Sequence, residues 1–164
     1  MRAFRHIDLK KKLELAASFP PLHEDWRDHP DLLTVPVSIW DHWLISSGSQ
    51  ALLNEATLAE EQDWNSRFDR LSERMLRNTE VLYIHWRKHK ELPYYKSVRS
   101  LPAATFALSS RNGYMFTLAL PEFGAFYELG FDFTAFFHFL QPDRAYTLIE
   151  WAEDCGLKVV QDRA

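Results

Sequence analysis

Histidine and cysteine are the residues of this chain whose side chains most often bind metals or attack substrates. The two best-spaced histidine pairs are His23 with His29, in the run HEDWRDH, and His85 with His89, in the run HWRKH. An H-x-x-x-H spacing brings two imidazoles together on a helix, but the residues around His85 alternate as in a strand, which keeps the two rings apart. A zincin would also need Glu where Trp86 stands. We therefore expect no metal site.

Covalent catalysis has equally little support. The single cysteine, Cys155, follows Glu153 and Asp154, whereas a reactive thiolate is favoured beside a cation or at a helix N-terminus. The chain has no G-x-S-x-G, P-loop or G-x-G-x-x-G motif, and its five glycines form no phosphate-binding loop. We expect a non-catalytic protein without a cofactor, and keep an enzyme of unknown class as the third alternative.

A cluster of acids lies at the start of a predicted helix. The segment from Glu55 to Asp63 contains four acids and no base, and Trp64 follows it. The simpler interpretation is a favourable interaction with the helix dipole, about 0.3–1 kcal/mol for each well-placed acid. The functional interpretation is a recognition surface for a basic partner, which would gain association rate and specificity. Glu60 is reserved for capping the helix, so the candidate partner-binding residues are Glu55, Glu61, Asp63 and Trp64.

A basic segment with interleaved aromatic residues spans residues 83–100. Cations beside aromatic rings are what a single-stranded nucleic acid or a phosphorylated ligand would need. The simpler interpretation is a solvated strand end and loop. The alternative ligand-binding residues are Trp86, Arg87, Lys88, Lys90, Tyr94 and Tyr95.

Length and composition limit the classes of protein. A chain of 164 residues matches one domain, residues 1–164. Its net charge of −4 argues against strong sequence-independent nucleic-acid binding by the whole molecule. A single cysteine excludes an internal disulfide, and the first residues lack the apolar run of a signal peptide. We therefore expect a protein of the reducing cytoplasm, without a membrane span.

Three helices are predicted in the first half of the chain. The first spans residues 8–19, and the second begins at Ser38 after a polar loop and ends at Gly48. The expected inner face of the first helix is Leu9, Leu13 and Ala16. The third begins with a capping box formed by Thr57 and Glu60 and runs to about residue 77. Its apolar residues at helical spacing are Trp64, Phe68, Leu71 and Met75.

The centre of the sheet is predicted between residues 102 and 140. Two runs of strand-forming residues, 105–109 and 114–120, flank Arg111-Asn112-Gly113, an arrangement typical of a β-hairpin. A three-residue loop with Gly113 in a left-handed conformation gathers the apolar residues of both runs on one face, so we prefer a bulged loop. That face would consist of Phe106, Leu108, Tyr114, Phe116, Leu118 and Leu120.

The remaining segments complete an α+β fold. Residues 81–86 and 123–129 are predicted strands, and residues 133–140 are ambiguous, although a cap at Asp132 or Thr134 favours helix. A helix from 142 to 154, with Tyr146, Ile149 and Trp151 facing inward, precedes a short strand at 157–161. We expect N-terminal helices packed on a mostly antiparallel sheet of about four to five strands, with a C-terminal helix and a short strand.

The run FFHFLQPD, residues 136–143, precedes a tryptophan-bearing helix in a small, acidic, aromatic-rich chain without catalytic motifs. In this general character the chain resembles bacterial immunity proteins that neutralise toxins. The resemblance implies a binding role, in which an acidic and aromatic surface occludes the active site of a basic toxin. We therefore expect a non-catalytic inhibitor or immunity-type protein, with a nucleic-acid or phospholigand binder as the alternative.

Overall fold

The computed structural model describes residues 1–22, 26–44, 48–86, 93–112, 115–130 and 132–161. Its strands are β1 (Phe4–His6), β2 (Leu33–Ser38), β3 (Leu82–His85), β4 (Tyr94–Val98), β5 (Thr117–Leu120), β6 (Ala125–Leu129), β7 (Thr134–Phe139) and β8 (Lys158–Val159). Its helices are α1 (Leu9–Ser18), α3 (Ala51–Asn54), α4 (Leu58–Asn78), α5 (Leu101–Ala107) and α6 (Ala145–Asp154). Short 3-10 turns are η1 (Trp26–Asp28), η2 (Ser110–Asn112), η3 (Pro121–Phe123) and η4 (Pro142–Arg144).

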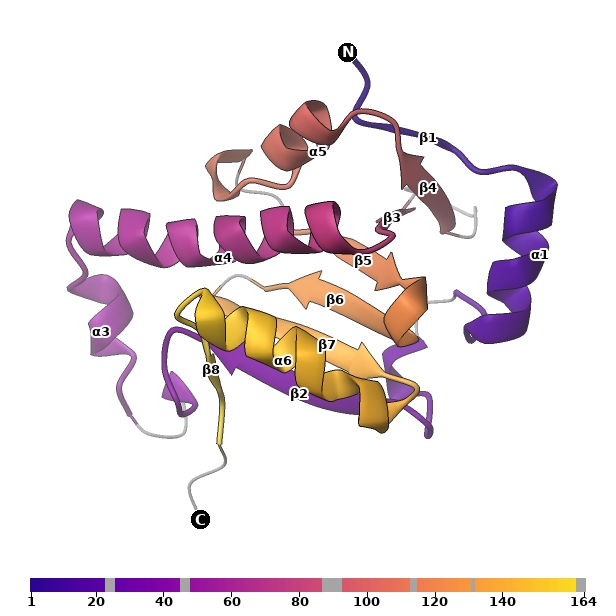
Figure 1. Ribbon diagram of the computed structural model, residues 1–164. Helices are drawn as coiled ribbons and strands as arrows, with labels where there is room; N and C mark the ends of the chain where they lie inside the picture. Colours follow the sequence, from indigo (N-terminus) through magenta and orange to yellow (C-terminus); the bar gives the residue numbers. More distant parts are fainter. Residues whose placement is uncertain (23–25, 45–47, 87–92, 113–114, 131, 162–164) are drawn as a thin grey trace.

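The strands form one open antiparallel sheet in the order β1-β4-β3-β5-β6-β7-β2-β8 (Figure 1). The α+β class is therefore confirmed, but the sheet within the described residues has eight strands instead of the expected four to five. The polar strands β1 and β4 were not predicted, because their short sequences lack a clear apolar alternation. No helix in the described part of the chain is both long and apolar enough to cross a membrane.

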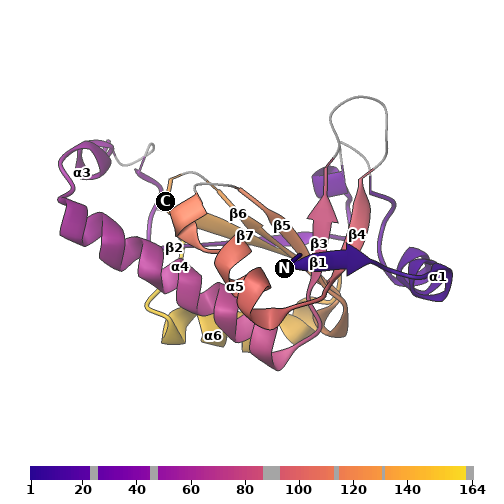
Figure 2. The same cartoon turned by 90° about the horizontal axis from the view of Figure 1, so that it is seen from above.

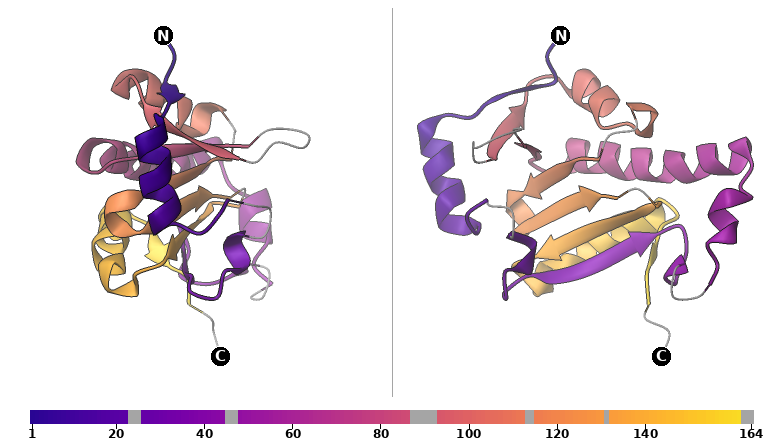
Figure 3. Two further views of the ribbon diagram at one scale, coloured as in Figure 1. Left: turned by 90° about the vertical axis from the view of Figure 1, so that its right-hand side faces the viewer. Right: turned by 180° about the vertical axis from the view of Figure 1, so that it is seen from behind.

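The two faces of the sheet are covered differently. On the front face, α4 and α6 pack over the sheet, and α5 lies against α4 (Figure 2). The rear face, seen in the right panel of Figure 3, has a smaller apolar cluster. Leu15 and Phe19 from the α1 end and Trp26 from η1 join that cluster. The larger core therefore lies between the sheet and its front helices.

The predicted hairpin at residues 105–120 is wrong. The Ser100 hydroxyl accepts a hydrogen bond from the Ala103 N–H, and Pro102 lies in the first turn, so residues 101–107 form α5. Phe106 is consequently 65% exposed on this helix. Of the expected inner face, Leu108, Phe116, Leu118 and Leu120 are buried. Gly113 and Tyr114 lie outside the described residues.

The predicted helix starting at Ser38 is also wrong over residues 38–43, and residues 45–47 lie outside the described part. Ser38 instead ends β2, in a segment expected to be a loop. The Pro36 carbonyl accepts a hydrogen bond from Val160 N–H at 3.0 Å. A strand residue directs its N–H and C=O to the same side, so the missing N–H of Pro36 faces the β8 side. The ladder between β2 and β7 is therefore left intact.

Three further expectations are corrected. Residues 134–139 form strand β7, which is central between β6 and β2, rather than a helix. In α1 the buried side contains Leu15, while Leu9 and Leu13 are 70% and 64% exposed. In α6 the buried residues are Ala145, Leu148 and Ala152, and Tyr146 is 74% exposed. Periodicity alone did not decide which apolar stripe of each helix meets the core.

Other elements agree with the sequence. Helix α4 begins at the predicted capping box and buries Phe68, Leu71 and Met75. Two ion pairs at i,i+4 spacing, Asp63 with Arg67 and Glu73 with Arg77, lie along α4, both at 2.7 Å. Strands β3 and β6 and helix α6 lie within the segments predicted for them.

Candidate functional site

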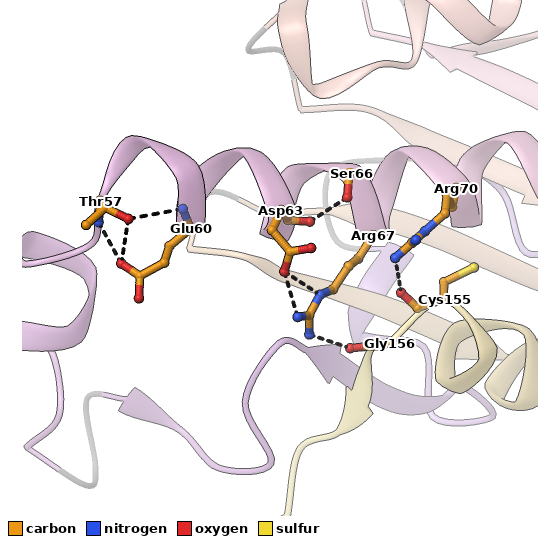
Figure 4. Close-up of polar contacts among 8 residues, drawn as sticks. All are labelled: Thr57, Glu60, Asp63, Ser66, Arg67, Arg70, Cys155 and Gly156. Atoms are coloured by element: carbon orange, nitrogen blue, oxygen red, sulfur yellow. Dashed lines mark hydrogen bonds and ion pairs between the residues drawn. The ribbon is translucent and has the colours of Figure 1, made fainter.

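Glu60 caps α4 through one of its two carboxylate oxygens. Its carboxylate accepts hydrogen bonds from the Thr57 N–H at 2.7 Å and the Thr57 hydroxyl at 2.9 Å (Figure 4). The Thr57 hydroxyl in turn accepts a bond from the Glu60 N–H at 3.2 Å. The backbone bond, followed by the hydroxyl bond, lowers the pKa of Glu60. This acid therefore stabilises the helix start.

Asp63 is bonded to Arg67 on the same helix, and Trp64 packs against neighbouring elements of the fold. The Arg67 guanidinium donates to the Asp63 carboxylate at 3.1 and 2.7 Å and to the Gly156 carbonyl at 3.0 Å (Figure 4). The Trp64 ring packs against Trp40 and Phe133, with centroids 5.3 and 5.2 Å away. Asp63 thus contributes to the contact with the α6 turn, and Trp64 to an aromatic cluster.

Glu61 lies on a different side of α4. Successive helix residues are rotated by about 100°, so Asp63 is turned by roughly 200° from Glu61. Glu61 and Leu58 instead lie along one stripe of α4 together with Gln62, Asn65 and Asp69, which follow them at helical spacing. Leu58 is 71% exposed and Glu55 is exposed just before the helix. The four sequence candidates are therefore not one patch, because only Glu55 and Glu61 remain unengaged among the described contacts.

A polar groove of about 440 Å³ continues the Glu61 stripe. We call it the α4 groove, and its lining is Gln62, Asn65, Ser66, Asp69 and Ser110. The Asp69 carboxylate accepts hydrogen bonds from the Ser110 N–H at 2.7 Å and the Ser110 hydroxyl at 2.9 Å, which fixes η2 against α4. Among the residues that the structure describes, this lining contains one carboxylate and no basic side chain.

The arginines of α4 point to the opposite side. Besides the Arg67 contacts, Arg70 donates to the Cys155 carbonyl at 3.1 Å, and Arg74 pairs with Asp154 at 2.7 Å (Figure 4 shows the first two). These guanidinium groups meet the C-terminal end of α6, where the helix dipole favours positive charge. Charge on α4 is therefore segregated, with cations toward α6 and acceptors along the groove.

The basic aromatic segment is only partly described. Arg87, Lys88 and Lys90 lie outside the described residues. Trp86 is 39% exposed, and the Arg27 guanidinium lies 5.8 Å from its ring centre. Tyr94 contacts the rings of His6 and His85, whereas Tyr95, next along β4, contacts Phe19 on the rear face. Burial raises the pKa of Tyr95. The described aromatic residues therefore do not share one face.

The structure reveals a polar cluster on the rear face that the sequence did not indicate. Arg27 donates to both oxygens of Glu128, and the Glu128 Oε2 lies 3.5 Å from the His138 Nε2. The other ring nitrogen of His138 is 2.9 Å from the Thr34 hydroxyl. Burial raises the pKa of Glu128, but His138 and Arg27 outweigh it and lower the pKa to about 2.

This rear-face cluster contains the residue types of a hydroxyl–imidazole–carboxylate relay. His138, however, is only 4% exposed, and the edge of Trp26 covers it at a centroid distance of 5.1 Å. The carboxylate is also neutralised by Arg27. We interpret the cluster as a structural link between η1 and the sheet. Thr34 and His138 are cross-strand partners 104 residues apart, so no local sequence signal could have paired them.

Within the described residues, no group of three or more His, Cys, Asp or Glu side chains could hold a metal ion. His23 and His89, one member of each histidine pair considered in the sequence, lie outside those residues. The His29 Nδ1 lies 3.9 Å from the Asp31 carboxylate, and the His85 ring lies 5.0 Å from the Tyr94 ring, tilted by 46°.

No family model matches the chain, and neither the curated proteins nor the solved structures give a significant match. The class is therefore defined by the structure itself, as an α+β protein with an open antiparallel sheet and helices on its front face.

Proposed function

We propose that this chain is a non-catalytic protein-binding module of the inhibitor or immunity type. Its partner would present a basic surface to the α4 groove and to the adjoining Leu58 and Glu61. The observation that carries this proposal is the α4 groove itself, because the described residues of its lining offer amide, hydroxyl and carboxylate groups and no basic side chain.

The chemistry of the groove suits lysine and arginine side chains. Asn65 and Gln62 supply amide oxygens, and Asp69 supplies a carboxylate whose existing bonds to Ser110 hold it in place. Carboxylates and amides are the acceptors that guanidinium and ammonium donors bind. Leu58, which is 71% exposed and lies one helical turn before the lining residue Gln62, would add apolar contact area.

The orientation of the α4 arginines supports the same partner. Arg67, Arg70 and Arg74 are held on the far side of the helix by the α6 end. They therefore do not face a cation approaching the α4 groove. Glu55 and Glu61 extend the negative charge toward the helix start, which would speed the encounter with a basic protein.

The test begins with affinity capture from the native host by tagged wild-type protein, followed by binding kinetics with the captured protein. We expect a basic partner. Glu61→Gln should slow its association several-fold at low salt, and Leu58→Gln should speed its dissociation.

The matched control is Asp63→Asn, which removes the same charge two positions later on the opposite side of α4. It should leave the association rate unchanged. An acidic partner, or equal losses in Glu61→Gln and Asp63→Asn, would remove the α4 groove from the interface.

A further inference from the structure

A second groove, of about 430 Å³, lies between α1 and the start of β4. We call it the α1 groove. Its lining is Lys12, Leu15, Ala16, Phe19, Pro20, Pro21, Leu22, Pro93, Tyr94 and Tyr95. All of these except Lys12 are apolar or aromatic. Both the volume and this composition are typical of sites for small organic ligands, which are mostly apolar with a few polar groups that orient the ligand.

The three consecutive lysines of α1 have different surroundings. Lys11 forms an ion pair with Glu80 at 2.7 Å, and Lys10 is exposed and does not line the groove. Lys12 lines the groove and has no ion pair with any residue in the described ranges. Among the described lining residues, it is thus the charge that a ligand would meet.

The rest of the described lining also favours an anion. The described lining contains no carboxylate that would attract a cation. An anionic ligand would therefore be favoured over a neutral or cationic ligand of the same shape.

The groove is held in shape by the fold. Asp8 caps α1 by accepting a hydrogen bond from the Lys11 N–H at 2.8 Å, and the pair of Lys11 with Glu80 ties the helix to the segment before β3. Leu15 and Phe19 are buried, and the Phe19 ring packs against Phe126 at 4.8 Å. A preformed groove loses little free energy to ordering when it binds.

We propose that the α1 groove is a binding site for a small amphipathic anion, an apolar chain or ring that carries one carboxylate. The apolar part lies against Phe19, the prolines and Tyr95, and the carboxylate pairs with Lys12. This site is independent of the proposed protein-binding surface, because α1 and the start of α4 lie at opposite sides of the molecule (Figure 1).

The experiment measures displacement of the fluorescent anion 8-anilinonaphthalene-1-sulfonate by decanoate and by decylammonium. Decanoate should displace the dye, and decylammonium should do so at least about tenfold more weakly, because its charge meets Lys12. Lys12→Glu should raise the dissociation constant of decanoate about tenfold, the factor expected for loss of one charge-assisted contact. Lys10→Glu makes the same charge change outside the lining and should alter it less than about twofold.

A second pair of variants tests the binding site by filling the groove with a large side chain. Ala16→Trp places a large ring in the α1 groove and should abolish decanoate binding, whereas Ala17→Trp, next on the same helix but outside the lining, should not. Equal displacement by decanoate and decylammonium would show a general apolar surface and overturn the proposal. So would equal effects of the two Lys→Glu variants, unchanged binding in Ala16→Trp, or no binding of decanoate at millimolar concentration.

Discussion

The Arg27 guanidinium donates two hydrogen bonds to the Glu128 carboxylate, from Nε to Oε2 at 2.7 Å and from Nη2 to Oε1 at 2.6 Å. The bonds join η1 to β6, 101 residues later in the chain. They hold Trp26 over the rear face, where its ring meets Phe126 at 4.5 Å and is fully buried. A two-pronged contact of this kind fixes orientation as well as distance.

This contact predicts a loss of stability in acid. The folded-state pKa of Glu128, about 2, lies below the ordinary value of 4.5. A lowered pKa means that the stabilisation is complete above about pH 4.5 and is lost as the pH falls toward 2. Because Arg27 is partly exposed, we expect a contribution of roughly 1–2 kcal/mol.

Urea unfolding at pH 7 and at pH 3 measures this contribution. Wild-type protein should lose more free energy of unfolding between the two pH values than Glu128→Gln does, by roughly 1 kcal/mol. Glu73→Gln is the matched control, since Glu73 pairs with Arg77 on the surface and should change stability by less than about 0.5 kcal/mol. An identical pH dependence in wild type and Glu128→Gln would mean that the contact of Arg27 with Glu128 contributes nothing to the free energy of unfolding.

The corrected core gives a second prediction. Phe116 is 6% exposed and its ring lies 6.1 Å from that of Tyr127, whereas Phe106 is 65% exposed. Phe116→Ala should destabilise the fold by about 3–5 kcal/mol, and Phe106→Ala by less than about 0.5 kcal/mol. Denaturant unfolding of the two variants compares them directly. Similar losses at the two positions would favour the hairpin over helix α5.

These two phenylalanines also show what the sequence could predict. Apolar character correctly predicted that Phe116 is buried, but it predicted the same for Phe106, which is exposed. The prediction failed at Phe106 because a strand and a helix place the same residue on different faces. The decisive local signals were the Ser100 cap and Pro102 in the first turn of α5. Helix α4 was predicted well because its capping box and its apolar spacing point to the same element.

The candidate sites were harder to predict for a geometric reason. Glu61 and Asp63 are close in sequence but lie on opposite sides of α4, a difference that helical rotation alone could have shown. Arg67, the partner of Asp63, also bonds to Gly156, 89 residues away, and this tertiary contact could not be foreseen from the sequence. The α4 groove and the α1 groove likewise combine residues from distant segments, Asp69 with Ser110 and Phe19 with Tyr95.

The absence of a local metal-ligand group in the described residues leads to a third prediction. We expect that treatment with a chelator leaves the melting temperature unchanged and that purified protein carries no stoichiometric zinc. Structural zinc is coupled to folding, so its removal would lower the melting temperature by several degrees. Calorimetry with and without the chelator measures the melting temperature, and elemental analysis of the purified protein measures its metal content. A stoichiometric metal would show that the histidine pairs were wrongly dismissed.

The last prediction concerns the thiol of Cys155, at the end of α6. The side chain is 5% exposed, and burial raises its pKa although Arg74 and Arg70 act in the opposite direction. Iodoacetamide should therefore label native protein far more slowly than urea-unfolded protein, because the reactive thiolate is scarce and shielded.

Labelling also reports the opening of the α6 turn. Arg70 donates to the Cys155 carbonyl at 3.1 Å, so Arg70→Ala should loosen this turn and raise the native labelling rate several-fold. Arg77→Ala removes an arginine of the same helix whose described bonds go to Glu73, and it should leave the rate unchanged. Mass spectrometry of timed aliquots gives both rates. If native wild type reacts as fast as unfolded protein, the turn does not protect the thiol, and the contact between α4 and α6 is weaker than its hydrogen bonds imply.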